Sequence, residues 1–302
     1  MKSNKGENMS SIYVFPGQGA QSVGMGLDLY QNNDAARAVF DEMDAALGEK
    51  LSDIIFNGPI DTLTLTANVQ PAILATSIAM FRAGNLPKPD YVAGHSLGEY
   101  TALCAAGAIS LRDAIKLVRL RGESMQNAVP AGQGAMAVIL GLEIEDLKSV
   151  CEKAESETGG VCDIANDNCP GQIVISGANN AIERAMELAK ESGAKRAMKL
   201  ALSVPPHSRL MEPVVEIMHK ALDDIEIKEP TVPLISNKTC KPMTDANEIK
   251  DALLYQITHG VRWRESVLGM VDLGIDDLTE IGPGEALIGM VKRITDKINA
   301  HK

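Results

Sequence analysis

Residues 91–107, YVAGHSLGEYTALCAAG, have the pattern of a short buried strand, a sharp turn and a helix of small residues. The turn places Ser96 in a G-x-S-x-G motif between Gly94 and Gly98. Glycines there permit a tight backbone and a close approach that a side chain would block. The amides that open the helix would point toward whatever the hydroxyl attacks. The motif is short, but between a strand and a helix it predicts a serine nucleophile that takes up an acyl group.

Composition narrows the class of protein. The chain has 302 residues, of which 45% are hydrophobic, and its formal net charge is −11. This charge argues against a nucleic-acid partner, and no apolar run is long enough to span a membrane. The five cysteines form no C-x-x-C pair, so neither a metal site nor a disulfide framework is expected. The sequence therefore predicts a soluble cytoplasmic α/β protein, with residues 1–8 as a disordered leader.

The order of expected elements divides the chain. In residues 9–131 and 204–302, strands alternate with helices, which is typical of a mostly parallel sheet covered on both faces. Residues 132–203 instead have the order β-α-β-β-α-β of a ferredoxin-like unit. We therefore expect a large α/β domain with a small subdomain inserted into it.

A serine nucleophile needs a base, and His207 is the best candidate. It follows Val204, Pro205 and Pro206, and two prolines hold the backbone before it in place. The order of serine before histidine also matches that of hydrolases. Of the other histidines, His259 stays open as a base. We expect His95 to be a turn or packing residue, His219 to be an ordinary helical residue, and His301 to lie in a frayed terminus.

The third member of a triad is missing from the sequence. Asp163 and Asp167 fall in the inserted subdomain, and Asp251 lies in the helical segment that also carries Gln256. None is a convincing acid for orienting the imidazole. We expect a serine–histidine dyad oriented by an uncharged acceptor.

Six stretches in order resemble the malonyl-CoA:acyl carrier protein transacylases of fatty acid synthesis. They are FPGQGAQ (15–21), GHSLGEY (94–100), RGESMQ (121–126), IANDNCPGQIVISG (164–177), SVPPHSRLM (203–211) and TEIGPGEAL (279–287). The resemblance covers nearly the whole chain after the leader. It implies an α/β-hydrolase-like large domain with an inserted ferredoxin-like subdomain, in agreement with the division above.

The resemblance also implies roles for single residues. Ser96 is the acylated nucleophile and His207 its base, and the backbone amides of Gln18 and Leu97 form the oxyanion hole. Arg121 holds the free carboxylate of the malonyl group, which suits a bidentate guanidinium. The supporting positions are the backbone carbonyl of Gln256, which orients the histidine, and a residue that lines the cleft from the small subdomain, Asn166.

From the residues alone, some of these assignments have alternatives. Arg121 shares a helix with Arg119 and Lys116 and could be a surface charge, although Arg119, two residues away, faces elsewhere. Gln18 could be a simple turn residue, and its glycine-rich turn lacks the lysine and hydroxyl of a phosphate loop. Pro206 and Ser208 flank the base in a segment linked to acyl-group choice, which leaves methylmalonyl as an alternative to malonyl.

The expected partners are malonyl-CoA as a substrate and an acyl carrier protein as the acceptor, without a metal or bound cofactor. Because the carrier is acidic, a chain of net charge −11 needs a local basic patch to dock it. Lys195, Arg196 and Lys199 are the candidates, and we expect a monomer. Two rival functions stay open at this point: a serine hydrolase, with water as the acceptor, and a carrier-binding scaffold with an inactive site.

Overall fold

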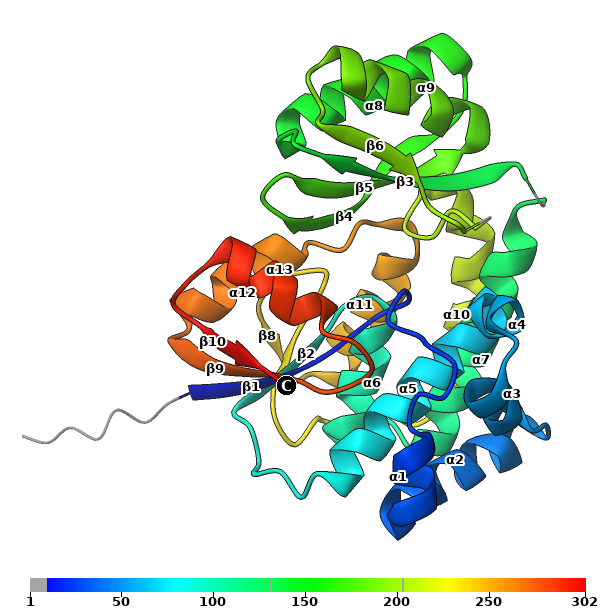
Figure 1. Ribbon diagram of the computed structural model, residues 1–302, viewed down its shortest axis with the longest axis vertical. Coiled ribbons are helices and arrows are strands. Elements are labelled where there is room, and N and C mark those ends of the chain that lie inside the picture. The colour runs from blue at the N-terminus through cyan, green and yellow to red at the C-terminus, as the bar shows by residue number, and fades with distance from the viewer. Residues whose placement is uncertain (1–9, 131, 203) are drawn as a thin grey trace, which may run out of the picture.

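The computed structural model describes residues 10–130, 132–202 and 204–302. The leader 1–8 lies outside the described residues. So do residue 131, the last of the first expected large-domain segment, and residue 203, the last of the expected subdomain 132–203. Two units are visible in Figure 1, each with its own sheet. The predicted α/β class is confirmed, because one sheet is mostly parallel and the other is antiparallel.

The large unit is built on a six-stranded sheet of order β10-β9-β1-β2-β7-β8. Its neighbours pair in parallel except for β7 and β8, which are antiparallel. The strands are β1 (Ser10–Phe15), β2 (Tyr91–Gly94), β7 (Leu234–Ile235), β8 (Pro242–Met243), β9 (Ile275–Glu280) and β10 (Asn299–His301). The expectation of a frayed terminus at His301 is wrong, because β10 pairs with β9 and the His301 ring bonds to Asp277.

Helices cover both faces of this sheet. The side chains of β1 show why, because successive residues point to opposite faces and both faces are apolar. Ile12 and Val14 point into a core with α12 and α13, whereas Tyr13 and Phe15 point into a core with the other helices. The helices are α1 (Leu27–Asn32), α2 (Asp34–Leu47), α3 (Leu51–Asn57), α4 (Ile60–Thr64), α5 (Thr66–Ala83), α6 (Leu97–Ala105), α7 (Leu111–Ala128), a 3₁₀ turn (Arg209–Met211), α10 (Glu212–Asp223), α11 (Ala246–Thr258), α12 (Trp263–Asp272) and α13 (Ala286–Ile294).

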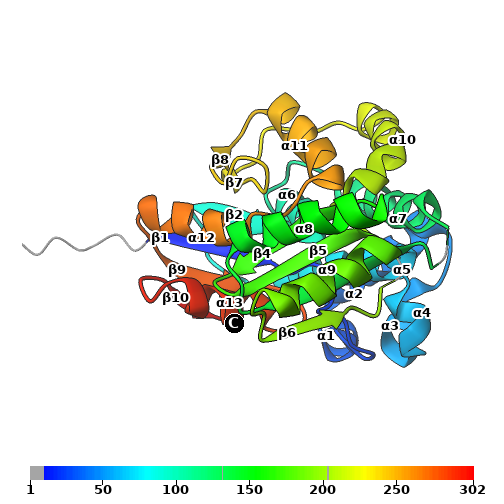
Figure 2. The same ribbon diagram turned by 90° about the horizontal axis from the view of Figure 1, so that it is seen from above.

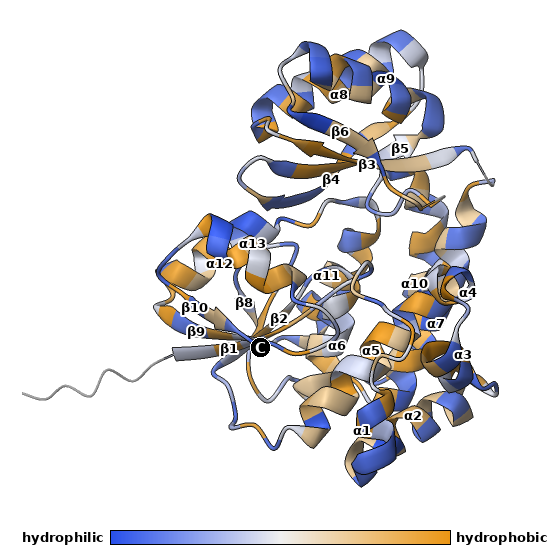
Figure 3. Ribbon diagram, viewed as in Figure 1, coloured by the Kyte–Doolittle hydropathy of each residue, from blue (hydrophilic) through white to orange (hydrophobic). Residues whose placement is uncertain are grey.

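The small unit is a four-stranded antiparallel sheet of order β4-β5-β3-β6, and its elements follow the predicted order β-α-β-β-α-β. They are β3 (Gly134–Leu140), α8 (Ile144–Thr158), β4 (Cys162–Cys169), β5 (Gln172–Ala178), α9 (Asn179–Glu191) and β6 (Arg196–Lys199). Both helices lie on one face of the sheet (Figure 2), where they enclose a separate apolar core. Figure 3 shows hydrophilic residues, in blue, on the outer side of α8 and α9.

The open face of the small sheet lies toward the large unit (Figure 1). Strand β4 joins the two units, because Asn166 forms a parallel bridge with Val261 and the Asp167 amide donates to the Val261 carbonyl at 2.9 Å. The Arg264 guanidinium also pairs with Asp167 at 2.9 Å. Within the described residues, no helix is both long and apolar enough to cross a bilayer.

Candidate active site

The turn that carries Ser96 is held by close backbone contacts. A Cβ on Gly94 would lie 1.9 Å from the carbonyl carbon of Gly98, and a Cβ on Gly98 would lie 2.1 Å from the carbonyl oxygen of Phe15. Both distances are far below contact, so only glycine fits at either position. The G-x-S-x-G spacing therefore lets the start of α6 pack directly on the end of β1.

Ser96 itself has a strained backbone, with φ 54° and ψ −111°. Asn237, which follows β7, stabilises this conformation. Its Oδ1 accepts from the Ser96 amide at 2.9 Å, and its Nδ2 donates to the Gly94 carbonyl at 2.7 Å. The side-chain amide of Asn237 thus ties the two sides of the turn together.

The structure brings Ser96 and His207 together, with 2.7 Å between Ser96 Oγ and His207 Nε2. On the other side of the ring, Nδ1 lies 2.7 Å from the backbone carbonyl of Gln256 and 3.2 Å from that of His259. Because a carbonyl only accepts, Nδ1 carries the proton and Nε2 is free to accept one from the serine. His259 thus contacts the site through its backbone, while its ring stacks on Tyr255.

Burial makes His207 a neutral base. The residue is 3% exposed. Its burial, followed by the positive charge of Arg121, lowers the pKa of His207 to about 3. At neutral pH the imidazole is therefore uncharged, which is the form that accepts a proton.

None of the three aspartates considered in the sequence contacts His207. Asp163 accepts from the Arg209 amide at 2.8 Å, Asp167 pairs with Arg264, and Asp251 pairs with Lys238. Their carboxylates are engaged in other contacts. The structure has the uncharged acceptor in the place where a triad has its acid.

Arg121 is buried beside the nucleophile, at 2% exposure. A Cβ on Gly122 would lie 2.4 Å from the Thr66 carbonyl, so α7 approaches α5 closely at this point. Arg121 Nη1 donates to Gln70 Oε1 at 2.7 Å, and Nη2 lies 3.2 Å from Ser96 Oγ. Arg119 faces elsewhere, as expected, and bonds to Asn68 at 2.7 Å. The surface-charge alternative for Arg121 is thereby excluded.

Gln256 contacts the site through its side chain as well as its carbonyl. Its Oε1 accepts from Arg121 Nη2 at 2.8 Å, and its Nε2 donates to Glu99 Oε2. The other Glu99 oxygen accepts from the Asn237 amide at 2.8 Å. Burial raises the pKa of Glu99 to about 7. A chain of hydrogen bonds therefore joins the elbow, the base and the guanidinium.

Sequence reasoning missed Gln70, Glu99 and Asn237. Glu99 lay within the recognised GHSLGEY stretch, and Asn237 follows a strand whose carboxyl end meets that of β2 at the same edge of the sheet. These two positions in the sequence could therefore have indicated that Glu99 and Asn237 lie near the site. Gln70 lies inside the apolar helix α5, and nothing in its local sequence indicates a role.

A cavity surrounds these groups and brings in the remaining predicted residues. Gln18, Leu97 and Asn166 all line it together with Ser96 and His207. Leu97 begins α6, so its amide belongs to the first turn, where amides lack a helical acceptor. The side-chain Nε2 of Gln18 and Oδ1 of Asn166 are buried without a hydrogen-bond partner among the described residues.

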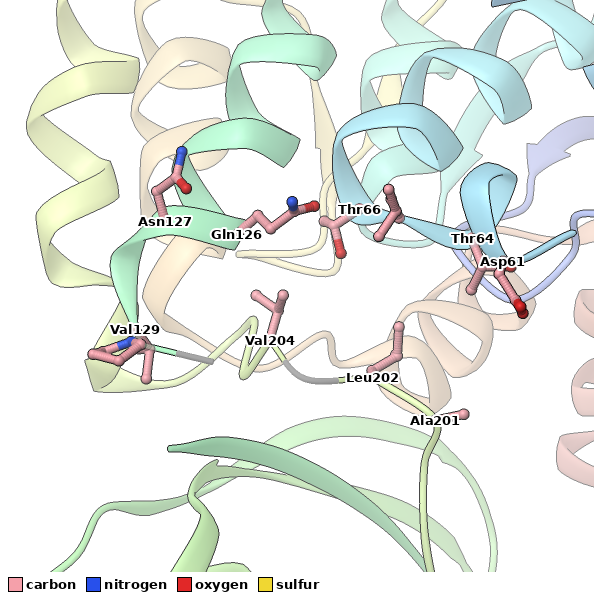
Figure 4. A pocket seen from close by; sticks show the side chains of 11 residues that line it. Asp61, Thr64, Thr66, Gln126, Asn127, Val129, Ala201, Leu202 and Val204 are labelled. Carbon is pink, nitrogen blue, oxygen red and sulfur yellow. The ribbon is translucent and has the colours of Figure 1, made fainter. Parts of the chain in front are cut away.

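Figure 4 shows the side chains that line a second hollow, which is larger than this cavity and has a volume of about 700 Å³. It lies between the start of α5, the end of α7 and the chain that returns from the small unit. Leu202 lines both hollows. The lining of the larger one mixes hydroxyl, amide and apolar side chains: Asp61, Thr64, Leu65, Thr66, Gln126, Asn127, Val129, Pro130, Ala201, Leu202 and Val204.

The three basic residues considered for docking differ from one another. Lys195, Arg196 and Lys199 are on or next to β6, an edge strand, and none of the three lines the cavity that holds Ser96. Lys199 bonds to Asn179 and pairs with Glu183 at 3.0 Å. Lys195 and Arg196 are exposed and form no ion pair with the described residues. Their charges are the more available of the three.

The other two histidines lie as follows. His95 Nε2 is 3.0 Å from Asn168 Oδ1 and its ring packs near Trp263, in agreement with a packing role for this cavity-lining residue. His219 pairs with Asp223 on the surface of α10. Among the described residues, no group of histidine, cysteine and acidic side chains is arranged as a metal site.

The model of the acyl transferase domain family matches residues 12–299. The chain belongs to the acyl transferase family. It is 50% identical over 294 residues to the malonyl CoA-acyl carrier protein transacylase of Bacillus subtilis, covering 96% of this chain and 92% of that relative. The predicted resemblance is thus confirmed over 96% of this acyl transferase.

Solved structures agree with this placement. An acyl-carrier-protein S-malonyltransferase from Bartonella henselae superposes with a TM-score of 0.94 at 49% identity, over 97% of this chain and 95% of that one. Another neighbour is a malonyl-transacylase in complex with a type II PKS acyl-carrier protein. It has a TM-score of 0.94 at 41% identity, and 97% of this chain and 96% of that one are covered. The expected two-unit architecture is therefore the architecture of these transacylases.

Proposed function

We propose that this acyl transferase moves a malonyl group from malonyl-CoA to the phosphopantetheine thiol of an acyl carrier protein, for fatty acid synthesis in the cytoplasm. The observation that carries the proposal is the Arg121 guanidinium, buried 3.2 Å from the nucleophilic oxygen of Ser96. A buried cation at this place favours an acyl group that ends in a carboxylate, because burying a charge without a partner is costly. A lipase or esterase has no use for that charge.

The first half-reaction acylates the serine. Ser96 Oγ attacks the thioester carbonyl carbon, its proton passes to His207 Nε2, and the carbonyl electron pair moves onto oxygen. The backbone amides of Gln18 and Leu97 stabilise that oxyanion. When the intermediate collapses, the carbon–sulfur bond breaks and the departing thiolate takes the proton from His207, which gives free CoA and malonyl-Ser96.

The second half-reaction runs the same steps with the carrier's thiol as the nucleophile. His207 accepts the thiol proton, sulfur attacks the malonyl ester carbon, and Ser96 Oγ leaves with the proton returned to it. We place the pantetheine arm in the larger hollow of Figure 4, whose hydroxyl and amide side chains suit the amide groups of the arm. Asn166 lines the cavity that holds the acyl group. Neither step requires a metal or a redox cofactor.

Intact mass spectrometry tests the proposal directly. The protein is mixed with malonyl-CoA and then chased with phosphopantetheinylated acyl carrier protein. We expect a malonyl adduct on the wild type that persists in buffer and moves to the carrier. Ser96→Ala should give no adduct, whereas Ser149→Ala, on the surface of α8, should behave as the wild type.

Two other results would overturn the proposal. An adduct that drains into free malonate whether or not the carrier is present identifies a hydrolase. The absence of any adduct on a folded wild-type protein identifies a binding protein with an inactive site.

A further inference from the structure

The hydrogen bonds of Arg121 all go to uncharged atoms. Nη1 donates to Gln70 Oε1, and Nη2 is shared between Gln256 Oε1 and Ser96 Oγ. Its Nε is buried and has no hydrogen-bond partner among the described residues. The guanidinium is therefore a desolvated cation that contacts no carboxylate and retains an unused donor. Such a group is poised for an anion that the described chain does not supply.

Glu99 does not fill this role. Its two oxygens accept from the Asn237 amide and from Gln256 Nε2, so the Gln256 side chain separates it from the guanidinium. Two other titratable residues near His207 also form no hydrogen bond with the guanidinium. His95 bonds to Asn168, and Arg209 is two residues along the chain, where it pairs with Asp163 and Glu155. No carboxylate of the described residues is therefore hydrogen-bonded to the guanidinium, and Glu99 acts on its charge only across the Gln256 side chain.

This arrangement opposes catalysis in the absence of substrate. Ser96 Oγ accepts from a cationic donor, which draws electron density away from the atom that must attack. The same oxygen lies 2.7 Å from His207 Nε2, so a proton arriving on the imidazole would create a second positive charge in a dry site. The low pKa of His207, which burial and then Arg121 cause, agrees with this reading.

We propose that the free carboxylate of the substrate activates the enzyme as well as binding to it. By pairing with Arg121, the carboxylate cancels the guanidinium charge and draws Nη2 away from Ser96 Oγ, so the serine–histidine pair reacts fast only with an acyl group that carries its own anion. In a malonyl group one methylene separates the carboxylate from the thioester carbonyl. A carbonyl carbon at Ser96 Oγ therefore brings the carboxylate within reach of a donor 3.2 Å from that oxygen.

The inference rests on the proposed function and adds a consequence for specificity. A site that merely binds the carboxylate would discriminate against acetyl-CoA through affinity alone. A site that the carboxylate activates discriminates in the rate of acylation at saturation.

Rapid-quench measurement of Ser96 acylation tests this, with intact mass as the readout. At saturating thioester, we expect acetyl-CoA to acylate about a hundredfold more slowly than malonyl-CoA, within the range that acid–base assistance contributes. Acetyl-CoA plus formate together contain the parts of a malonyl thioester. Added formate should therefore raise the limiting acetylation rate by about tenfold. Formamide, which has a similar shape without charge, and chloride at equal ionic strength should not.

The outcomes separate the inference from the proposed function. Equal limiting rates for the two thioesters would overturn the inference. So would formate that slows malonylation by competing for the site and leaves acetylation unchanged. In Arg121→Gln we expect faster acetylation than in the wild type and no response to formate, and stimulation by formate in this variant would also count against the inference. If malonyl-CoA does not label Ser96 in the wild type, it is the proposed function that fails.

Discussion

His207 Nδ1 donates its proton to the backbone carbonyl of Gln256 across 2.7 Å. A carbonyl fixes the tautomer and the ring orientation, as a triad carboxylate does. Unlike the carboxylate, it has no full negative charge to stabilise a protonated imidazole. The base in this site is therefore oriented by the end of α11, and no acidic side chain contacts it among the described residues.

The first prediction concerns the missing acid. Asp163→Asn and Asp251→Asn should leave the rate of Ser96 acylation within about twofold of the wild type, because neither carboxylate contacts His207. His207→Ala should lower it by about 10²–10⁴-fold through loss of the base. Single-turnover acylation by malonyl-CoA measures all three. A loss in either folded aspartate variant that approaches the loss in His207→Ala would indicate a triad.

The second prediction concerns the elbow. Gly98→Ala would place a Cβ 2.1 Å from the Phe15 carbonyl oxygen, and neither backbone can move without separating α6 from β1. We expect a loss of about 3 kcal/mol or more in the free energy of unfolding, together with loss of acylation. Gly289→Ala is the matched control. It lies in α13 with open space around its Cβ, so the alanine should stabilise the protein by about 0.5–1 kcal/mol. Urea denaturation compares the two, and equal stability of both variants would show that the contact at Gly98 relaxes.

Local pattern was sufficient to predict the fold class, the dyad and the order of the small unit. The strand–turn–helix around Ser96 could be recognised because its constraints are local: two glycines and a change of hydrophobic period. The contacts of Asn237 and Gln70 could not be predicted in this way. They depend on which strands and helices become neighbours, and α5 and α7 approach at Gly122 only after the chain has folded.

The short strand β7 illustrates the same limit. Its sequence VPLISN predicts a strand, and the structure assigns only Leu234 and Ile235 to it. The functional residue is Asn237, just beyond the strand, and its partner Ser96 lies 141 positions earlier in the chain. A contact of such separation is set by the pairing of β7 with β2, which no single stretch of sequence determines.

The third prediction uses the low pKa of His207. In the unfolded chain this imidazole binds a proton near its ordinary pKa of 6.5, but in the folded protein it stays neutral until about pH 3. Its contribution to stability is therefore complete above pH 6.5 and is lost as the pH falls from 6.5 toward 3, by at most about 1.4 kcal/mol per pH unit. His207→Gln should flatten this slope between pH 6.5 and 5, measured by urea denaturation. An identical slope in the wild type and His207→Gln would contradict the burial argument.

The fourth prediction has the opposite sign. Burial raises the pKa of Glu99 from 4.5 to about 7, so between these values the folded protein retains a proton that the unfolded chain releases. The stabilising contribution of this group is thus complete below pH 4.5 and is lost as the pH rises toward 7. Glu99→Gln should remove that loss and give a steeper rise in stability from pH 5 to 7 than the wild type shows. A shallower rise in the variant would mean that Glu99 is ionised throughout this range.

The last prediction concerns the carrier. Lys195 and Arg196 are exposed and form no ion pair with the described residues, whereas Lys199 already pairs with Glu183. Reversing the first two charges, as Lys195→Glu with Arg196→Glu, should lower kcat/KM for the acidic carrier by about tenfold and make it less sensitive to salt. Acylation of Ser96 by malonyl-CoA should stay within about twofold.

A matched control separates local docking from overall charge. Lys220→Glu with Lys228→Glu changes the net charge by the same amount, at exposed positions on and after α10. If the basic edge of β6 docks the carrier, the control should transfer malonyl nearly as fast as the wild type, because interactions beyond about 8 Å are screened at physiological salt. Equal losses in both double variants would indicate that general repulsion from a chain of net charge −11 governs association. Loss of self-acylation together with transfer in the β6 variant would show instead that these residues act on the site itself.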